Sequence, residues 1–165
     1  MGMEERRENK MGEIIRANAS EVYPYQTYAR FDSLMKLLPI FNEGREDELF
    51  PCIVGRFPQG LITIDGHQRL TLADLFGKKL SLYIMDNEGD LIQRALFPDL
   101  DLNNLWHANI IAAFTYENAA IQARKIQESN CPYTFAQHRR ENGIDDLESL
   151  ERMIRQYCPN QGAAA

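Results

Sequence analysis

The stretch LITIDGHQRLTLADLFG at residues 61–77 decides the fold. Its first four residues are apolar or β-branched, which favours a buried strand. From position 68 onward leucine and phenylalanine recur at helical spacing, and Gly77 supplies the helix stop. Asp65 and Gly66 make a turn between the two elements. The stretch therefore predicts a strand, a sharp corner and a helix that follows directly.

This corner has the chemistry of an anion site. A helix that begins at a glycine turn presents free backbone N–H groups and a partial positive charge, which attract phosphate. Arg69 in the first turn would add a forked donor. The structural alternative is that Asp65 caps the helix and Arg69 is a solvated surface residue. The residues alone favour this alternative, because few strand-turn-helix corners bind phosphate.

Three segments around the corner follow one family pattern. They are the box DGHQR at 65–69, the helix that runs to Gly77 and the strand LSLYIM at 80–85. Together they resemble the ParB/sulfiredoxin-like superfamily over residues 13–86. The resemblance implies a small mixed-sheet core in which a G-[EH]-x-R box holds nucleotide phosphates.

The resemblance also implies which residues bind phosphate. The box itself is matched by Gly66, His67, Gln68 and Arg69. Asp65 matches the acid that often precedes the box, and Arg30 stands at the start of a helix, where the ParB pattern often carries an arginine. The structural alternative for Arg30 is a surface cation beside tyrosines.

The branches of the family differ in chemistry. ParB-like domains hold nucleotide phosphates, sulfiredoxins hold ATP, and a related branch phosphorylates free serine with ADP. Sulfiredoxins carry a catalytic cysteine where this chain has His67, which argues against sulfinic acid reduction. The serine kinases carry a catalytic glutamate between the first strand and the first helix, where residues 23–29 contain no acid. The resemblance implies a ligand of the ATP, ADP or CTP class, with Mg²⁺ as an optional companion.

We therefore expect a non-catalytic regulatory module that binds a nucleotide or another small phosphorylated ligand at residues 65–69. The first alternative is a small-molecule phosphotransferase that resembles the free-serine kinases. The second is a DNA-binding, partition-type or nuclease protein. Lys and Arg total 18 against 24 Asp and Glu, and the net charge of −6 argues against nucleic acid as a partner of this chain.

Composition and cysteine usage set the broad class. With 165 residues and 44% hydrophobic content, the chain has enough apolar residues to form one sizeable core. The three cysteines, at 52, 131 and 158, are widely spaced and form no metal or redox pair. The acids at 43, 46, 47 and 48 fit a solvated loop better than a metal site. No leader or membrane span is apparent, so we expect a cytoplasmic protein.

The order of elements predicts an α+β fold. We expect a first strand at 13–17, a loop at 22–26, a helix from Phe31 that ends near Pro39, and a hairpin at 52–64.

After residue 98 the pattern becomes helical. The chain thus divides into a core at 13–98 and a helical extension at 99–159 that packs on the core. Its helices include residues 105–114, 116–127 and 147–157, and their apolar faces offer a surface for a protein partner or a homodimer. We interpret Trp106 and His107 as packing residues. We expect Arg139 and Arg140 to be solvated, and the sequence contains no convincing helix-turn-helix pattern.

Overall fold

The computed structural model describes residues 13–86, 116, 119–121, 123–125 and 133–159. The expected helix at 105–114, with Trp106 and His107, lies outside the described residues, and so does Cys131. Among the described residues, no helix is both long and apolar enough to cross a membrane.

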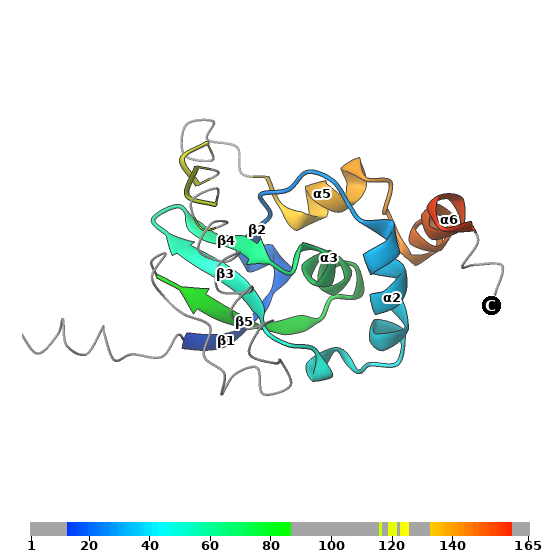
Figure 1. Ribbon diagram of the computed structural model, residues 1–165, viewed down its shortest axis with the longest axis horizontal. Helices are drawn as coiled ribbons and strands as arrows, with labels where there is room; N and C mark the ends of the chain where they lie inside the picture. Colours follow the sequence, from blue (N-terminus) through cyan, green and yellow to red (C-terminus); the bar gives the residue numbers. More distant parts are fainter. Residues whose placement is uncertain (1–12, 87–115, 117–118, 122, 126–132, 160–165) are drawn as a thin grey trace, which may run out of the picture.

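A five-stranded mixed sheet forms the centre of the molecule, with the strand order β1-β5-β3-β4-β2 (Figure 1). The outer pair β1 and β5 and the hairpin β3 and β4 are antiparallel, whereas β3 and β5, and also β2 and β4, are parallel. The sheet and its helices confirm the α+β class. The strands are β1 (Glu13–Asn18), β2 (Val22–Tyr23), β3 (Cys52–Phe57), β4 (Gly60–Asp65) and β5 (Lys79–Met85).

Both faces of the sheet are buried, and β5 shows why. Side chains alternate between the faces of a strand, so Leu82 and Ile84 join one hydrophobic cluster while Tyr83 and Met85 join another. The first cluster lies under the main helices. The second is covered by the helical residues 119–121 and 123–125, whose Ala119 and Ala123 are fully buried.

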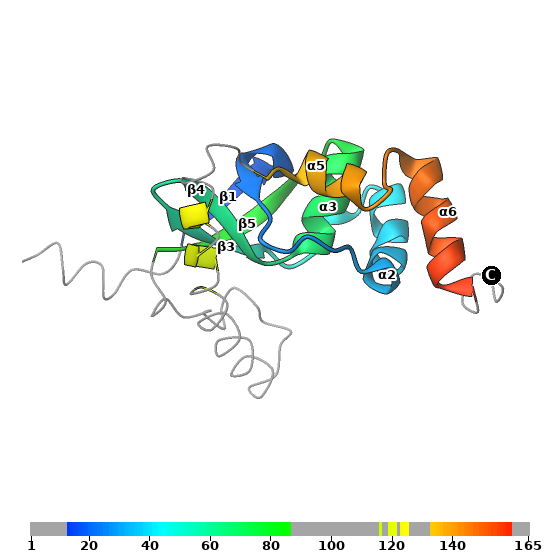
Figure 2. The same ribbon diagram turned by 90° about the horizontal axis from the view of Figure 1, so that it is seen from above.

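The helices stack outward from one face of the sheet. Figure 2 shows α3 against the sheet, α2 beyond it and α6 farthest out, with α5 lying over α3. Residues from α5, α6 and the turn between them share the hydrophobic cluster of the sheet, so the C-terminal helices pack on the core. The helices are α2 (Phe31–Asn42), α3 (His67–Phe76), α5 (Phe135–Glu141) and α6 (Leu147–Tyr157), with short 3₁₀ turns η1 (Ala19–Glu21) and η2 (Glu46–Glu48).

Helix α2 does not end near Pro39, as the sequence predicts, but continues through this residue to Asn42. Proline removes one helical N–H bond, yet the turn after it contains Phe41, which is 2% exposed and packs against Phe76. We attribute the continued helix to this buried aromatic contact.

Two segments expected to be loops carry short regular structure. Residues 22–23 form β2, a two-residue edge strand that pairs with β4 and ends before Pro24. The acidic segment contains η2, in which Glu46 is buried and lies 3.9 Å from Lys78, so this acid is not solvated as expected.

Candidate functional site

The corner between β4 and α3 has the predicted form. Strand β4 ends at Asp65, Gly66 takes φ of 120°, and α3 begins at His67. A Cβ atom on Gly66 would lie 2.6 Å from Sγ of the buried Cys52. Both the positive φ and this close approach require glycine, so the corner is tightly specified.

The first turn of α3 lacks a side-chain cap. The first helical bond runs from Leu70 N to the Gly66 carbonyl, and no side chain caps the helix. Within the part of the chain that the structure describes, the N–H groups of residues 67–69 have no hydrogen-bond partner. The alternative in which Asp65 caps α3 is therefore wrong; its carboxylate, 68% exposed, lies 3.4 Å from Arg69 instead.

A cavity of about 290 Å³ lies at this corner. Its lining brings together all six residues that the sequence singles out as phosphate-binding candidates, although Arg30 is 35 or more positions before the others. No motif in the sequence indicates the remaining lining residues, which come from the loop before α2, from α2 and from β4. The full lining is Gln26, Tyr28, Arg30, Ser33, Leu37, Ile64, Asp65, Gly66, His67, Gln68 and Arg69.

The side chain of His67 has a structural role in this corner. It is 4% exposed, and its Nε2 accepts hydrogen bonds from the backbone N–H groups of Tyr25 and Gln26 at 3.1 and 3.3 Å. Burial, and to a lesser degree the nearby His138, lowers the pKa of His67 to about 3. The ring is therefore neutral near pH 7 and carries its proton on Nδ1.

Arg69 is neither a solvated residue nor a free anion ligand. Its side chain is only 15% exposed, and Nη1 donates to the carbonyls of Phe50 and Pro51 at 2.6 and 3.4 Å. The guanidinium thus ties the start of α3 to the segment before β3. Its positive charge still lies beside the cavity, where it adds to the potential of the helix N-terminus.

Arg30 supplies the solvent-facing cation of the cavity. Its side chain is 59% exposed and lies 3.4 Å from the equally exposed Asp32. The backbone N–H of Arg30 donates to Oε1 of Gln68 at 3.1 Å, which fixes the start of α2 against the first turn of α3. An exposed pair of this kind is weak, so the guanidinium can turn to a ligand at little cost.

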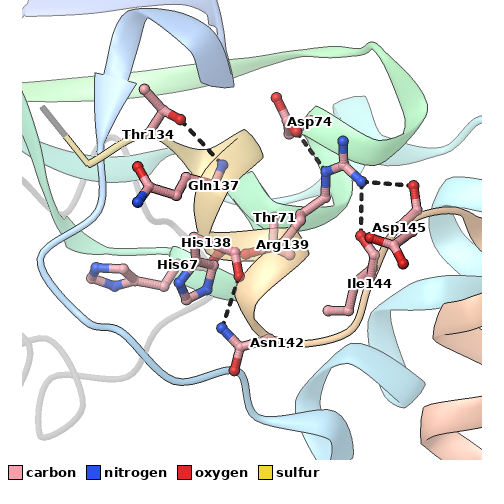
Figure 3. A network of polar contacts seen from close by, with 10 residues as sticks. All are labelled: His67, Thr71, Asp74, Thr134, Gln137, His138, Arg139, Asn142, Ile144 and Asp145. Carbon is pink, nitrogen blue, oxygen red and sulfur yellow. Dashed lines mark hydrogen bonds and ion pairs between the residues drawn. The ribbon is translucent and has the colours of Figure 1, made fainter.

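Helix α5 also packs beside this corner, and no local sequence pattern indicates this contact. Figure 3 shows His138 and Asn142 of this region near His67, whereas Arg139 extends toward Asp74. Arg139 is not solvated as expected: its Nε lies 2.6 Å from Oδ2 of Asp74 on α3, and both side chains are largely buried. Arg140 is exposed, as predicted.

The described residues contain no cluster of three or more His, Cys, Asp or Glu side chains that could hold a metal ion. Cys52 and Cys158 are free thiols, and Cys52 is buried with its pKa raised by desolvation. Asp65 is an exposed carboxylate at the edge of the cavity.

Comparisons with known proteins do not assign a family. Neither protein-family models nor curated proteins give a match to this chain. The resemblance to the ParB/sulfiredoxin-like superfamily stays a proposal, which rests on the residues of the corner.

Proposed function

We propose that this chain is a nucleotide-binding regulatory module whose α3 corner holds the phosphates of the ligand. The observation that carries the proposal is the cavity itself: it is lined by residues 67–69, whose N–H groups are uncapped, and by Arg30, whose guanidinium is exposed. Backbone N–H groups at a helix N-terminus and a forked arginine are complementary to phosphate oxygens.

Each group has a separate task in this proposal. The N–H groups of the first turn donate to one phosphate, and Arg30, just before α2, contributes a charge-assisted bond. Ser33 and the NH₂ group of Gln68 are further donors in the lining. Arg69 acts through its positive charge, and its contacts with the Phe50 carbonyl and Asp65 hold the corner in place.

The size of the cavity favours a nucleotide that is only partly enclosed. About 290 Å³ is at the lower end of ligand sites, enough for the phosphate groups and too small to enclose a whole nucleotide. Tyr28 lines the cavity and is 54% exposed, so its ring offers a face on which a base can stack. This aromatic surface supports a nucleotide over inorganic phosphate.

Magnesium fits the site as a companion of the ligand. Mg²⁺ typically binds one or two carboxylates together with substrate phosphates and waters. Asp65 is the carboxylate among the described residues of the cavity lining, so we assign it to the ion when the ligand brings one.

A thermal-shift screen tests this function. ATP, ADP, CTP and pyrophosphate are each added at millimolar concentration with and without MgCl₂. A ligand that binds only the folded state raises the melting temperature by mass action, so we expect at least one nucleotide to do so. Arg30→Ala should lose the shift and Arg140→Ala, at an exposed site on α5, should keep it. No shift with any of the four would overturn the proposal, and conversion of ADP to AMP in the presence of free serine would favour the phosphotransferase alternative.

A further inference from the structure

The loop at residues 24–30 forms one wall of the cavity, through Gln26, Tyr28 and Arg30. This loop has no helix or strand of its own. Its backbone polar groups form hydrogen bonds with side chains from α3 and with Asn142, the residue after α5. From α3, His67 accepts from residues 25 and 26, and Gln68 accepts from residue 30.

The middle of the wall is held by Asn142, which directly follows α5. Its Oδ1 accepts from the N–H of Ala29 at 3.0 Å, and its Nδ2 donates to the carbonyl of Thr27 at 3.0 Å. The same Nδ2 also donates to the carbonyl of His138 at 2.8 Å. One side chain therefore bonds the wall on both sides of Tyr28. The bond to the carbonyl of His138 fixes this side chain to the last turn of α5 (Figure 3).

Helix α5 is in turn fixed to α3, the element that carries the phosphate-binding turn. Arg139 is paired with Asp74, and the ring of Phe135 is completely buried with a centroid 6.2 Å from that of His67. The wall is thus held against α3 in two ways: directly by His67 and Gln68, and through Asn142 at the end of α5.

We propose that Asn142 is a positioning residue for the phosphate site and that α5 regulates ligand affinity through it. This inference rests on the proposed function of the corner. If the wall is released, only a fraction of molecules has the binding arrangement, and the apparent dissociation constant rises by the inverse of that fraction. The coupling is reciprocal: a ligand that fixes the wall also stabilises α5, and a partner that moves α5 changes ligand affinity.

Two variants at opposite ends of α5 test the proposal. Asn142→Ala removes the bonds to the wall. Thr134→Ala is the matched control, because Thr134 caps the N-terminus of α5 by accepting from Gln137 N at 3.1 Å and is not part of the cavity lining. Hydrogen exchange is measured at the amides of Gln26 and Arg30, which bond to α3 and not to Asn142. Calorimetry with ATP, ADP, CTP and pyrophosphate gives the affinities.

We expect Asn142→Ala to bind the tightest of the four probes roughly tenfold more weakly, as for a wall that is correctly placed about a tenth of the time. Exchange at Gln26 and Arg30 should rise in this variant and not in Thr134→Ala. In the parent, the probe should slow exchange across α5, and Asn142→Ala should lose that effect.

Equal affinity and equal wall exchange in the parent and Asn142→Ala would overturn the proposal, as would the same losses in both variants. If the parent binds none of the four probes, the proposed function fails. The exchange data then show by themselves whether Asn142 orders the wall, so the two failures are distinguishable.

Discussion

Nε of Arg139 lies 2.6 Å from Oδ2 of Asp74, and this ion pair joins α5 to α3 across 65 positions of sequence. The same guanidinium donates through Nη1 to the carbonyl of Ile144 at 2.8 Å, in the turn that leads to α6. Both charged side chains are about 15% exposed, so water screens the pair only weakly. A single arginine thus connects the core to both C-terminal helices.

Replacing Arg139 with alanine should therefore lower the free energy of unfolding by about 2–3 kcal/mol, because the variant leaves Asp74 without its cation in a largely buried position. Urea denaturation measures this loss. Arg140→Ala is the matched control: this neighbour is exposed, and its loss should stay within about 0.5 kcal/mol. Equal stability of the two variants would show that the ion pair does not hold α5.

The buried His67 should make the fold sensitive to acid. Its pKa is lowered to about 3 in the folded state, against an ordinary value of 6.5. The unfolded chain therefore binds the proton first, and stability that is complete above pH 6.5 falls as the pH drops toward 3. Protonation of Nε2 would also abolish the bonds from Tyr25 and Gln26.

Between pH 6.5 and 4.5 the protonation of this histidine should lower the free energy of unfolding by roughly 2–3 kcal/mol. Urea denaturation across that range measures the loss, and His67→Gln removes the titrating group while keeping an acceptor. The variant should be less stable than the parent at pH 7 and have a shallower pH dependence. Identical pH dependence in the two proteins would contradict the assignment of His67 as a buried, neutral acceptor.

Gly66 should tolerate no side chain. Gly66→Ala places a methyl group 2.6 Å from Sγ of Cys52 at a φ of 120°, so we expect a loss of at least about 3 kcal/mol or failure to fold. Gly77→Ala is the control, since Gly77 also has positive φ, of 64°, but an added Cβ atom there would meet nothing within 4 Å. It should cost only about 1–2 kcal/mol. Thermal denaturation of both variants separates the clash from the strain of the backbone.

The fold was predictable where the signal is local. The apolar run before Asp65, the glycine at position 66 and the helical spacing up to Gly77 specify β4, the corner and α3 within one short segment. The expected end of the helix near Pro39 was wrong because burial of Phe41 outweighs the local preference of proline.

The site was predictable only in part. Its six candidates line one cavity, but Arg69 was expected to be available to a ligand, and the structure directs it to the carbonyls of Phe50 and Pro51. Those carbonyls reach α3 only through the pairing of β3 with β4. The role of Asn142 depends on contacts with residues more than 100 positions earlier, for which the sequence has no local pattern.

The two arginines of the cavity should therefore differ. Arg30→Ala should weaken nucleotide binding by ten- to a hundredfold with little change in stability, because its exposed pair with Asp32 contributes little to stability whereas its bond to the ligand phosphate is charge-assisted. Arg69→Ala should reduce stability by about 1–3 kcal/mol as well as affinity, since it leaves the carbonyl of Phe50 without this donor. Calorimetry and urea denaturation on both variants measure the contrast. Arg30→Ala that binds as tightly as the parent would remove this residue from the site.

An ADP titration followed by backbone amide NMR tests the phosphate site most directly. The amide resonances of His67, Gln68 and Arg69 should shift in a saturable manner, and more than those of β1 or α6, because their uncapped N–H groups acquire phosphate acceptors. CTP and ATP should shift the same amides if the phosphates and not the base are held there. Unchanged resonances at these three residues with millimolar ADP, ATP and CTP would contradict a phosphate site at the start of α3.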